Sequence, residues 1–282
     1  MILFATALLA ADALPFAPPI DKPLVYRQTE DRIAPDGSAA HFTLTEEVRF
    51  TRDGTGYILT VRALSAEAQA PDAAAASFRA GMKPFIGIPV ATRLSAAGEP
   101  GEVIDADATW QRVVQSIEQA AATASPPRNG IGPMLAGFRA MPAPAREAML
   151  KGPAIALLGL SLPPLPEGGS GPLAETMDTP LGIPIACSGT VRRDTDRDGA
   201  IRYSADLSSD PDAARRIAAQ TRTTGAPADA IAVQSLHEHR ETSLSASSGL
   251  LLSSVSKFAR IDPAAPGGER PVSQRGLMLV SQ

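Results

Sequence analysis

The sequence is short of the residues on which many chemistries depend. It has one cysteine, three histidines and 4% aromatic residues in 282 positions. A single cysteine excludes a disulfide within the chain, and few aromatic rings leave little for stacking bases or sugars. Neither the dinucleotide-binding glycine fingerprint nor the P-loop pattern occurs in the sequence. These shortages favour a non-catalytic protein over an enzyme.

Charge and hydropathy exclude two further classes of partner. The formal net charge is −4. The chain therefore lacks the excess of basic residues that is typical of proteins that bind nucleic acid or an anionic membrane surface. No apolar run reaches the roughly 20 residues that a membrane-spanning helix needs. We therefore expect no nucleic-acid partner and no transmembrane span.

The first residues resemble an export signal. An apolar run over 1–10 is followed by Ala11-Asp12-Ala13, which fits the small-x-small cleavage pattern. No Lys or Arg precedes the run, which leaves a buried first helix as the alternative. We expect a signal peptide over 1–13, a proline-rich extended leader over 14–23, and a periplasmic or secreted protein.

Period-two alternation of apolar and polar residues dominates the chain after the leader. It predicts a three-stranded antiparallel meander over 24–65, in which only Glu46 interrupts an apolar face. Apolar residues at helical spacing around Trp110 predict a helix over 108–123. We therefore expect an α+β fold, with an antiparallel, strongly curved β-sheet and helices packed on one side.

The expected organisation is one compact domain over 24–282, built from three segments. A first β-meander and helix unit covers 24–104, a helical insert with an apolar loop covers 105–171, and a second hairpin and helix unit covers 172–282. Within the insert, the apolar run Ala154–Leu162 is interpreted as a buried core helix or strand. A flap over a pocket is the alternative.

Three landmarks occur twice and suggest that the two outer units are related. Arg-Asp-Gly turns stand at 52–54 and 197–199, and Pro-Asp helix starts follow each of them. Leu-Ser-Ala turns begin at Leu94 and Leu244. Asp-Gly turns and Pro-Asp helix starts are common in α+β proteins, so the similarity of the two units has two possible explanations, duplication and chance.

The Asp-rich turn is the sharpest metal-like motif. Asp194, Asp196 and Asp198 precede a glycine and copy the first part of an EF-hand calcium loop. Position twelve, which should be a bidentate glutamate, is Ala205. A solvated acidic hairpin turn is therefore favoured, with a weak calcium site as the alternative.

A second constellation consists of His237, His239 and Glu241. Alternate residues of a strand share one face, so these three could converge on zinc. A metal-dependent hydrolase is the functional alternative that this set supports, and solvent-facing histidines explain it equally well. We expect no cofactor, with calcium and zinc as the two alternatives.

An exported curved sheet, interrupted by helices and an apolar loop, resembles the unclosed half-barrel family of periplasmic lipoprotein carriers. The resemblance covers about residues 24–280 and is one of architecture, with no specific motif. It implies a concave sheet face that binds acyl chains, with 155–162 as cover. The implied lining residues are Phe42, Leu44, Phe50, Tyr57, Leu59 and Val61.

Two interpretations of function stay open beside the hydrolase. The first is a non-catalytic cell-envelope protein that binds a hydrophobic small molecule or a lipid in the sheet concavity. The second is a structural or adaptor protein that binds an envelope protein through its sheet edges. In the second case the six apolar residues named above simply form the core.

Overall fold

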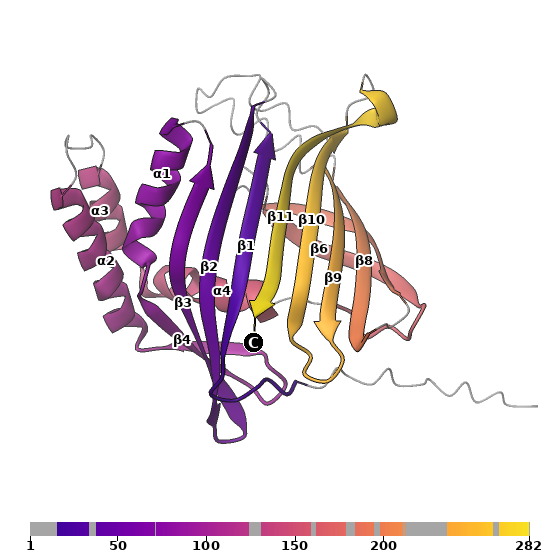
Figure 1. Cartoon of the computed structure of the whole chain (residues 1–282), viewed down its shortest axis with the longest axis horizontal. Helices are drawn as coiled ribbons and strands as arrows, with labels where there is room; N and C mark the ends of the chain where they lie inside the picture. Colours follow the sequence, from indigo (N-terminus) through magenta and orange to yellow (C-terminus); the bar gives the residue numbers. More distant parts are fainter. Residues whose placement is uncertain are drawn as a thin grey trace, which may run out of the picture.

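The computed structural model describes residues 16–33, 38–70, 72–123, 131–158, 162–178, 184–194, 198–210, 212, 236–261 and 265–281. These residues form one sheet of eleven strands together with four α-helices (Figure 1). The strands are β1 Pro23–Ile33, β2 Ala39–Asp53, β3 Gly56–Gln69, β4 Pro89–Leu94, β5 Pro100–Ile104, β6 Ser170–Asp178, β7 Pro184–Arg193, β8 Ala200–Ser209, β9 Leu236–Ser245, β10 Leu251–Ile261 and β11 Glu269–Ser281. The helices are α1 Asp72–Met82, α2 Ala106–Thr123, α3 Ile131–Ala140 and α4 Ala143–Leu158. The predicted α+β class, made mostly of sheet, is confirmed.

The strand order is β5-β4-β3-β2-β1-β11-β10-β9-β8-β7-β6, and every neighbouring pair is antiparallel. Each half is a simple meander, and the pairing of β1 with β11 joins the two ends of the chain at the middle of the sheet. The sheet is open and curled, and α4 lies behind its central strands in the view of Figure 1. Long twisted antiparallel sheets curl in this way because each strand pair adds to the same right-handed twist.

Hairpin turns fall where the sequence predicted them. Asp53 and Gly54 end β2 before β3, and Asp198 and Gly199 precede β8. The Leu-Ser-Ala turns join β4 to β5 and β9 to β10. β6 begins at Ser170, β9 extends to Ser245, and β11 spans 13 residues. The helix predicted after Pro211 lies outside the described residues except for Asp212, as do residues 1–15 of the expected signal and leader.

The helix around Trp110 is confirmed as α2. Trp110 is buried, its ring stacks on Phe138 of α3 at 5.4 Å, and its indole Nε1 donates to the Phe138 carbonyl at 3.1 Å. Helix α4 continues through Pro153 to Leu158. The helical part of the apolar run thus includes Ala154 and Leu157, which pack in the main core. None of the described helices has both the length and the apolar character needed to cross a bilayer.

The main core fills one end of the curled sheet. It unites side chains of both halves, including Leu24, Val48, Phe50, Leu59, Leu207, Leu244 and Leu251. The extended segment 16–22 lies against it: the Phe16 ring meets Tyr57 edge-on at 5.4 Å, and the Ala17 amide donates to the Ser248 carbonyl at 3.0 Å. Cys187, the one cysteine of the chain, is buried there as well.

Candidate functional site

The strand register places polar side chains side by side on the inner face of the sheet. In one row, Phe42 of β2 pairs with Glu30 of β1, and Glu30 pairs with Arg275 of β11. The same row continues from Arg275 to Ser256 of β10 and from Ser256 to Arg240 of β9. The next row towards the core continues with Leu44, Gln28, Leu277, Ser254 and Thr242. Residues in a row are about one strand spacing, roughly 4.8 Å, apart. The row of charged residues therefore crosses the middle of the concave face.

A cavity of about 550 Å³ lies over these rows. One wall is mainly apolar and includes α1 and α4, and the other carries hydroxyl and charged groups from β1, β6, β9, β10 and β11. The lining residues are Gln28, Thr29, Glu30, Phe42, Leu44, Phe78, Met82, Ala156, Glu175, Thr176, Glu238, Arg240, Ser254, Ser256, Phe258, Arg275, Gly276 and Leu277. A volume of this size is in the range of small-molecule sites.

Arg240 is the centre of the first charge cluster, which we call the acidic cluster: Glu175, Glu238 and Arg240. Its Nε donates to Glu238 at 2.9 Å and its Nη1 to Glu175 at 3.3 Å, while Nη2 donates to both carboxylates. Glu175 is on edge strand β6, three strands away from β9 in the sheet order. The small residues Ala205 on β8 and Gly189 on β7 lie between these strands on the same face.

The two carboxylates stabilise the charged form of the Arg240 guanidinium. Burial would lower the pKa of the Arg240 guanidinium, but its bonds to Glu175 and Glu238 outweigh that effect and raise the pKa. The Glu238 side chain is only 2% exposed and that of Arg240 is 12% exposed. Two negative charges therefore share one positive charge at a nearly dry position.

The second cluster, which we call the basic cluster, consists of Arg32, Glu30 and Arg275. Glu30 accepts from Arg32 Nη2 at 2.8 Å and from Arg275 Nε at 3.3 Å. Burial would raise the pKa of Glu30, but the two arginines together outweigh it and lower the pKa. The guanidinium of Arg32 lies over the ring of Phe42, and that of Arg275 over the ring of Phe258.

A second, smaller cavity of about 130 Å³ adjoins the first, since Leu44 and Met82 line both. Its walls are apolar except for Glu46, which is 3% exposed. The Glu46 carboxylate accepts from Gln28 Nε2 at 2.7 Å. Burial raises the pKa of Glu46, and the bond from Gln28 only partly opposes this. The residue that interrupts the apolar face of β2 is thus a buried carboxyl group in the wall of the smaller cavity.

Replacing Glu46 with Gln should make the fold less sensitive to high pH. A carboxyl whose folded-state pKa is raised stabilises the fold while it is protonated, and that stability is lost as the pH rises through the folded-state pKa. Glu46→Gln keeps an acceptor for Gln28 and removes the charge. We expect the variant to gain stability over the parent as the pH rises from 5 to 8, measured by urea unfolding.

The matched control is Glu47→Gln, on the opposite face of β2. Its exposed pair with Arg62 at 3.1 Å is worth less than about 1 kcal/mol, so its loss should be small. An equal pH dependence of the Glu46→Gln variant and the parent would contradict the role given to Glu46.

The six apolar residues proposed as lining fall in different places. Phe42 and Leu44 line the main cavity, and Leu44 and Val61 line the smaller one. Phe50, Tyr57 and Leu59 belong to the main core. Of the proposed cover, Ala156 lines the main cavity, Ile155 is exposed, and 159–161 lie outside the described residues.

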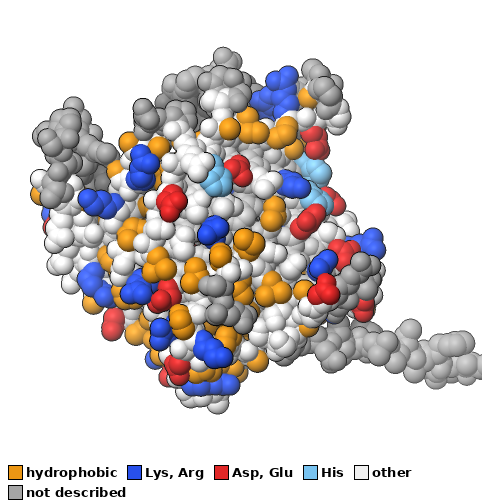
Figure 2. Space-filling model, viewed as in Figure 1, with side chains coloured by type: hydrophobic (Ala, Val, Ile, Leu, Met, Phe, Trp, Pro, Cys, Tyr) orange, Lys and Arg blue, Asp and Glu red, His pale blue; other side chains and the backbone are white. Residues whose placement is uncertain are grey.

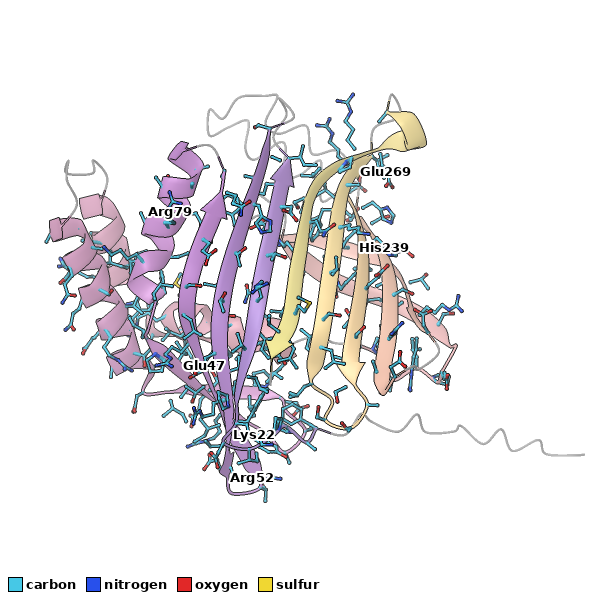
Figure 3. All side chains as sticks on the ribbon, viewed as in Figure 1. Lys22, Glu47, Arg52, Arg79, His239 and Glu269 are labelled. Atoms are coloured by element: carbon cyan, nitrogen blue, oxygen red, sulfur yellow. The ribbon has the colours of Figure 1, made fainter. Side chains whose placement is uncertain are left out.

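His237 and His239 lie on the outer face of the sheet, because they alternate along β9 with Glu238 and Arg240 of the inner face. His237 contacts Glu269 at 2.8 Å, and His239 contacts Asp206 at 2.7 Å and Glu241 at 3.3 Å. The hydrogen bond with Asp206 raises the pKa of His239, with a smaller contribution from Glu241, and slight burial opposes both. Figure 2 shows histidines beside acidic side chains on this face, and Figure 3 labels His239 and Glu269 there.

No group of His, Cys, Asp or Glu in the described part of the chain has three members placed to hold a metal. Asp194 pairs with Arg192 at 3.4 Å, and Asp198 is at the turn with a φ of 55°. Asp196 lies outside the described residues. The zinc and calcium alternatives stay predictions.

Sequence reasoning missed the charged residues of the cavity: Glu30, Glu175, Glu238, Arg240 and Arg275. One signal was present on β9, where Leu236, Glu238, Arg240, Thr242 and Leu244 alternate with the histidine set. Apolar residues at both ends of this series mark it as the inner face. β1, β6 and β11, which carry Glu30, Glu175 and Arg275, have polar residues on both faces, so their alternation alone does not say which face is inside.

Comparison with known proteins gives no family for this chain. No family model matches the sequence, and no curated protein matches it. Among solved structures, Rv2717c from M. tuberculosis has 10% identity and a TM-score of 0.26, with 91% of each chain covered. DynF from the dynemicin biosynthesis pathway of Micromonospora chersina has 8% identity and a TM-score of 0.19, with 96% of this chain and 84% of that chain covered. Similarity at this level is too low to inform fold or function.

Proposed function

We propose that this chain is a non-catalytic protein of the cell envelope that binds a lipid-like, amphiphilic ligand in the main cavity. The observation that supports this most is the combination of an apolar wall and a charged wall around one volume of about 550 Å³. Phe42, Leu44 and Met82 offer contact to a hydrocarbon part. The charged clusters and the hydroxyl groups of Ser254 and Ser256 offer partners to a polar head.

The resemblance to the half-barrel lipoprotein carriers supports the same proposal from the architecture. In that family acyl chains bind on a concave sheet face beneath helices. Here residues of α1 and α4 take part in lining the cavity over a curled sheet. The export signal predicted over 1–13 would deliver such a protein to the periplasm, and N-terminal sequencing of the protein from that compartment tests this part.

The cavity can be tested by filling it. Leu44 lines both cavities, so a larger ring at this position blocks the point where they meet. We expect an uncharged apolar fluorophore, N-phenyl-1-naphthylamine, to bind the parent protein and to lose at least about tenfold in affinity in Leu44→Trp. Fluorescence titration measures this directly.

The control is Leu64→Trp, which makes the same change at an exposed position of β3. It should bind the fluorophore as the parent does. Equal binding by the parent and by Leu44→Trp would place the fluorophore elsewhere and contradict the proposed site.

A further inference from the structure

The carboxyl group of Glu46 uses only half of its hydrogen-bonding capacity. Its Oε2 accepts from Gln28 Nε2 at 2.7 Å. Its Oε1 has no hydrogen bond or ion pair with any residue that the structure describes, although Glu46 is only 3% exposed. Buried polar atoms normally have a partner, so Oε1 points to a polar group that comes from outside the chain.

The smaller cavity is the space that Oε1 faces. This oxygen lacks a partner, and yet it is not one of the fully enclosed polar atoms of the described residues, so open space reaches it. Glu46 lines the smaller cavity, and every other described residue that lines it is apolar. The wall of this cavity therefore offers no second side chain that could bond to the carboxyl group.

The smaller cavity extends the apolar part of the main one. Leu44 and Met82 line both cavities, and Gln28, the partner of Glu46, lines the main one. A hydrocarbon chain whose head lies at the charged wall of the main cavity thus passes Leu44 and Met82 before it reaches Glu46. The smaller volume of about 130 Å³ equals that of roughly four water molecules in the liquid, so it has room for part of a chain.

A hydroxyl group is the polar group that fits Oε1 best. It donates to a carboxylate and accepts from a protonated carboxyl, so it suits either form of Glu46. An ammonium group carries three donors, and apolar walls with a single free oxygen leave the others unsatisfied at a high desolvation cost. A second carboxylate would meet a like charge.

We propose that the ligand carries a hydroxyl group on its hydrocarbon chain and that this hydroxyl binds Oε1 of Glu46 in the smaller cavity. This assignment rests on the proposed function and narrows its ligand to an amphiphile with a polar head and a hydroxylated chain. A chain without the hydroxyl fills the apolar space but leaves the buried oxygen without a partner, which is costly.

The test compares linear diols with alcohols of the same length, which differ only in the second terminal hydroxyl. Diols and alkan-1-ols of eight, ten and twelve carbon atoms compete with N-phenyl-1-naphthylamine for the parent protein. In a purely apolar cavity the second hydroxyl weakens binding, because it is buried without a partner. We expect instead that at least one diol binds as tightly as its alcohol or more tightly. Alcohols that bind at least about tenfold more tightly than the diols at all three lengths overturn the assignment.

Variants of Glu46 then show where the second hydroxyl binds. Glu46→Leu should lower the affinity of the diol relative to the alcohol at least about tenfold, whereas Glu46→Gln keeps an acceptor oxygen and should retain most of it. Glu47→Leu, on the outer face of β2, should change neither affinity. The same ratio of diol to alcohol affinity in the parent and in Glu46→Leu overturns the assignment.

A cationic probe and the fluorophore itself complete the experiment. Tighter binding of 12-aminododecan-1-ol than of dodecane-1,12-diol also overturns the assignment, since it favours an ammonium group at Glu46. The ranking by the parent protein decides the matter even where a variant fails to fold. If the fluorophore does not bind the parent, the proposed function fails as well; if it binds and the diols are disfavoured, only this assignment fails.

Discussion

Replacing Arg240 with Met is expected to destabilise the fold by about 3–5 kcal/mol. The substitution leaves Glu238, 2% exposed, and Glu175 without the guanidinium that both of them contact. A buried charge that loses its partner costs far more than the pair itself contributes. Because Glu175 is on edge strand β6, the loss should also free that edge. Urea unfolding gives the free energy, and hydrogen exchange of β6 amides gives the local effect.

Two further variants distinguish the cost of an unpaired buried charge from the cost of simply losing an arginine side chain. Arg62→Met removes an arginine whose pair with Glu47 is exposed, and it should cost less than about 1 kcal/mol. The triple variant Glu175→Leu, Glu238→Leu, Arg240→Met should recover most of the lost stability, because no charge is then left unpaired. A triple variant that is less stable than Arg240→Met would contradict this explanation.

Gly189→Ala is expected to destabilise the protein by about 1–3 kcal/mol, or more if the strands do not adjust. A Cβ at Gly189 would lie 1.9 Å from the backbone oxygen of Asp206 on β8, and no side-chain rotation relieves a clash with backbone. β7 and β8 must therefore separate. These are the strands that lie between Arg240 and Glu175, so the variant should also weaken the acidic cluster.

The same substitution at Gly137 should have the opposite sign. Gly137 is exposed inside α3, and a Cβ there meets nothing within 4 Å. Alanine is favoured over glycine in a helix interior by roughly 0.5–1 kcal/mol, so Gly137→Ala should stabilise the protein by up to that amount. Equal effects of the two substitutions in urea unfolding would show that the close approach at Gly189 is not rigid.

Local patterns in the sequence were sufficient for the elements that have one apolar face. The meander of β1, β2 and β3 and the helix around Trp110 follow directly from period-two and helical spacing. β6 is hard to predict because it contains Gly171 and Pro172, which are typical of loops, although both are acceptable on an edge strand. The length of β11 is hard to predict because polar residues lie on both of its faces, with Ser273 and Arg275 on the inner face and Gln274 on the outer face.

The candidate site depended on information that single strands do not contain. Glu30 and Arg275 meet only because β1 pairs with β11, which joins positions 245 residues apart in the chain. Glu175 and Arg240 meet only because the sheet curls and small residues stand between them. Alternation along β9 offered two faces, one with histidines and one with Glu238 and Arg240, and the register of the sheet decided between them.

The most direct test of the account is native mass spectrometry of the protein gently extracted from the cell envelope. If the concavity is a ligand site, the parent protein carries a bound amphiphile, Leu64→Trp carries the same one, and Leu44→Trp carries none. Parent protein without any bound molecule, in a preparation that also fails to bind N-phenyl-1-naphthylamine, would contradict the claim that this cavity is a binding site.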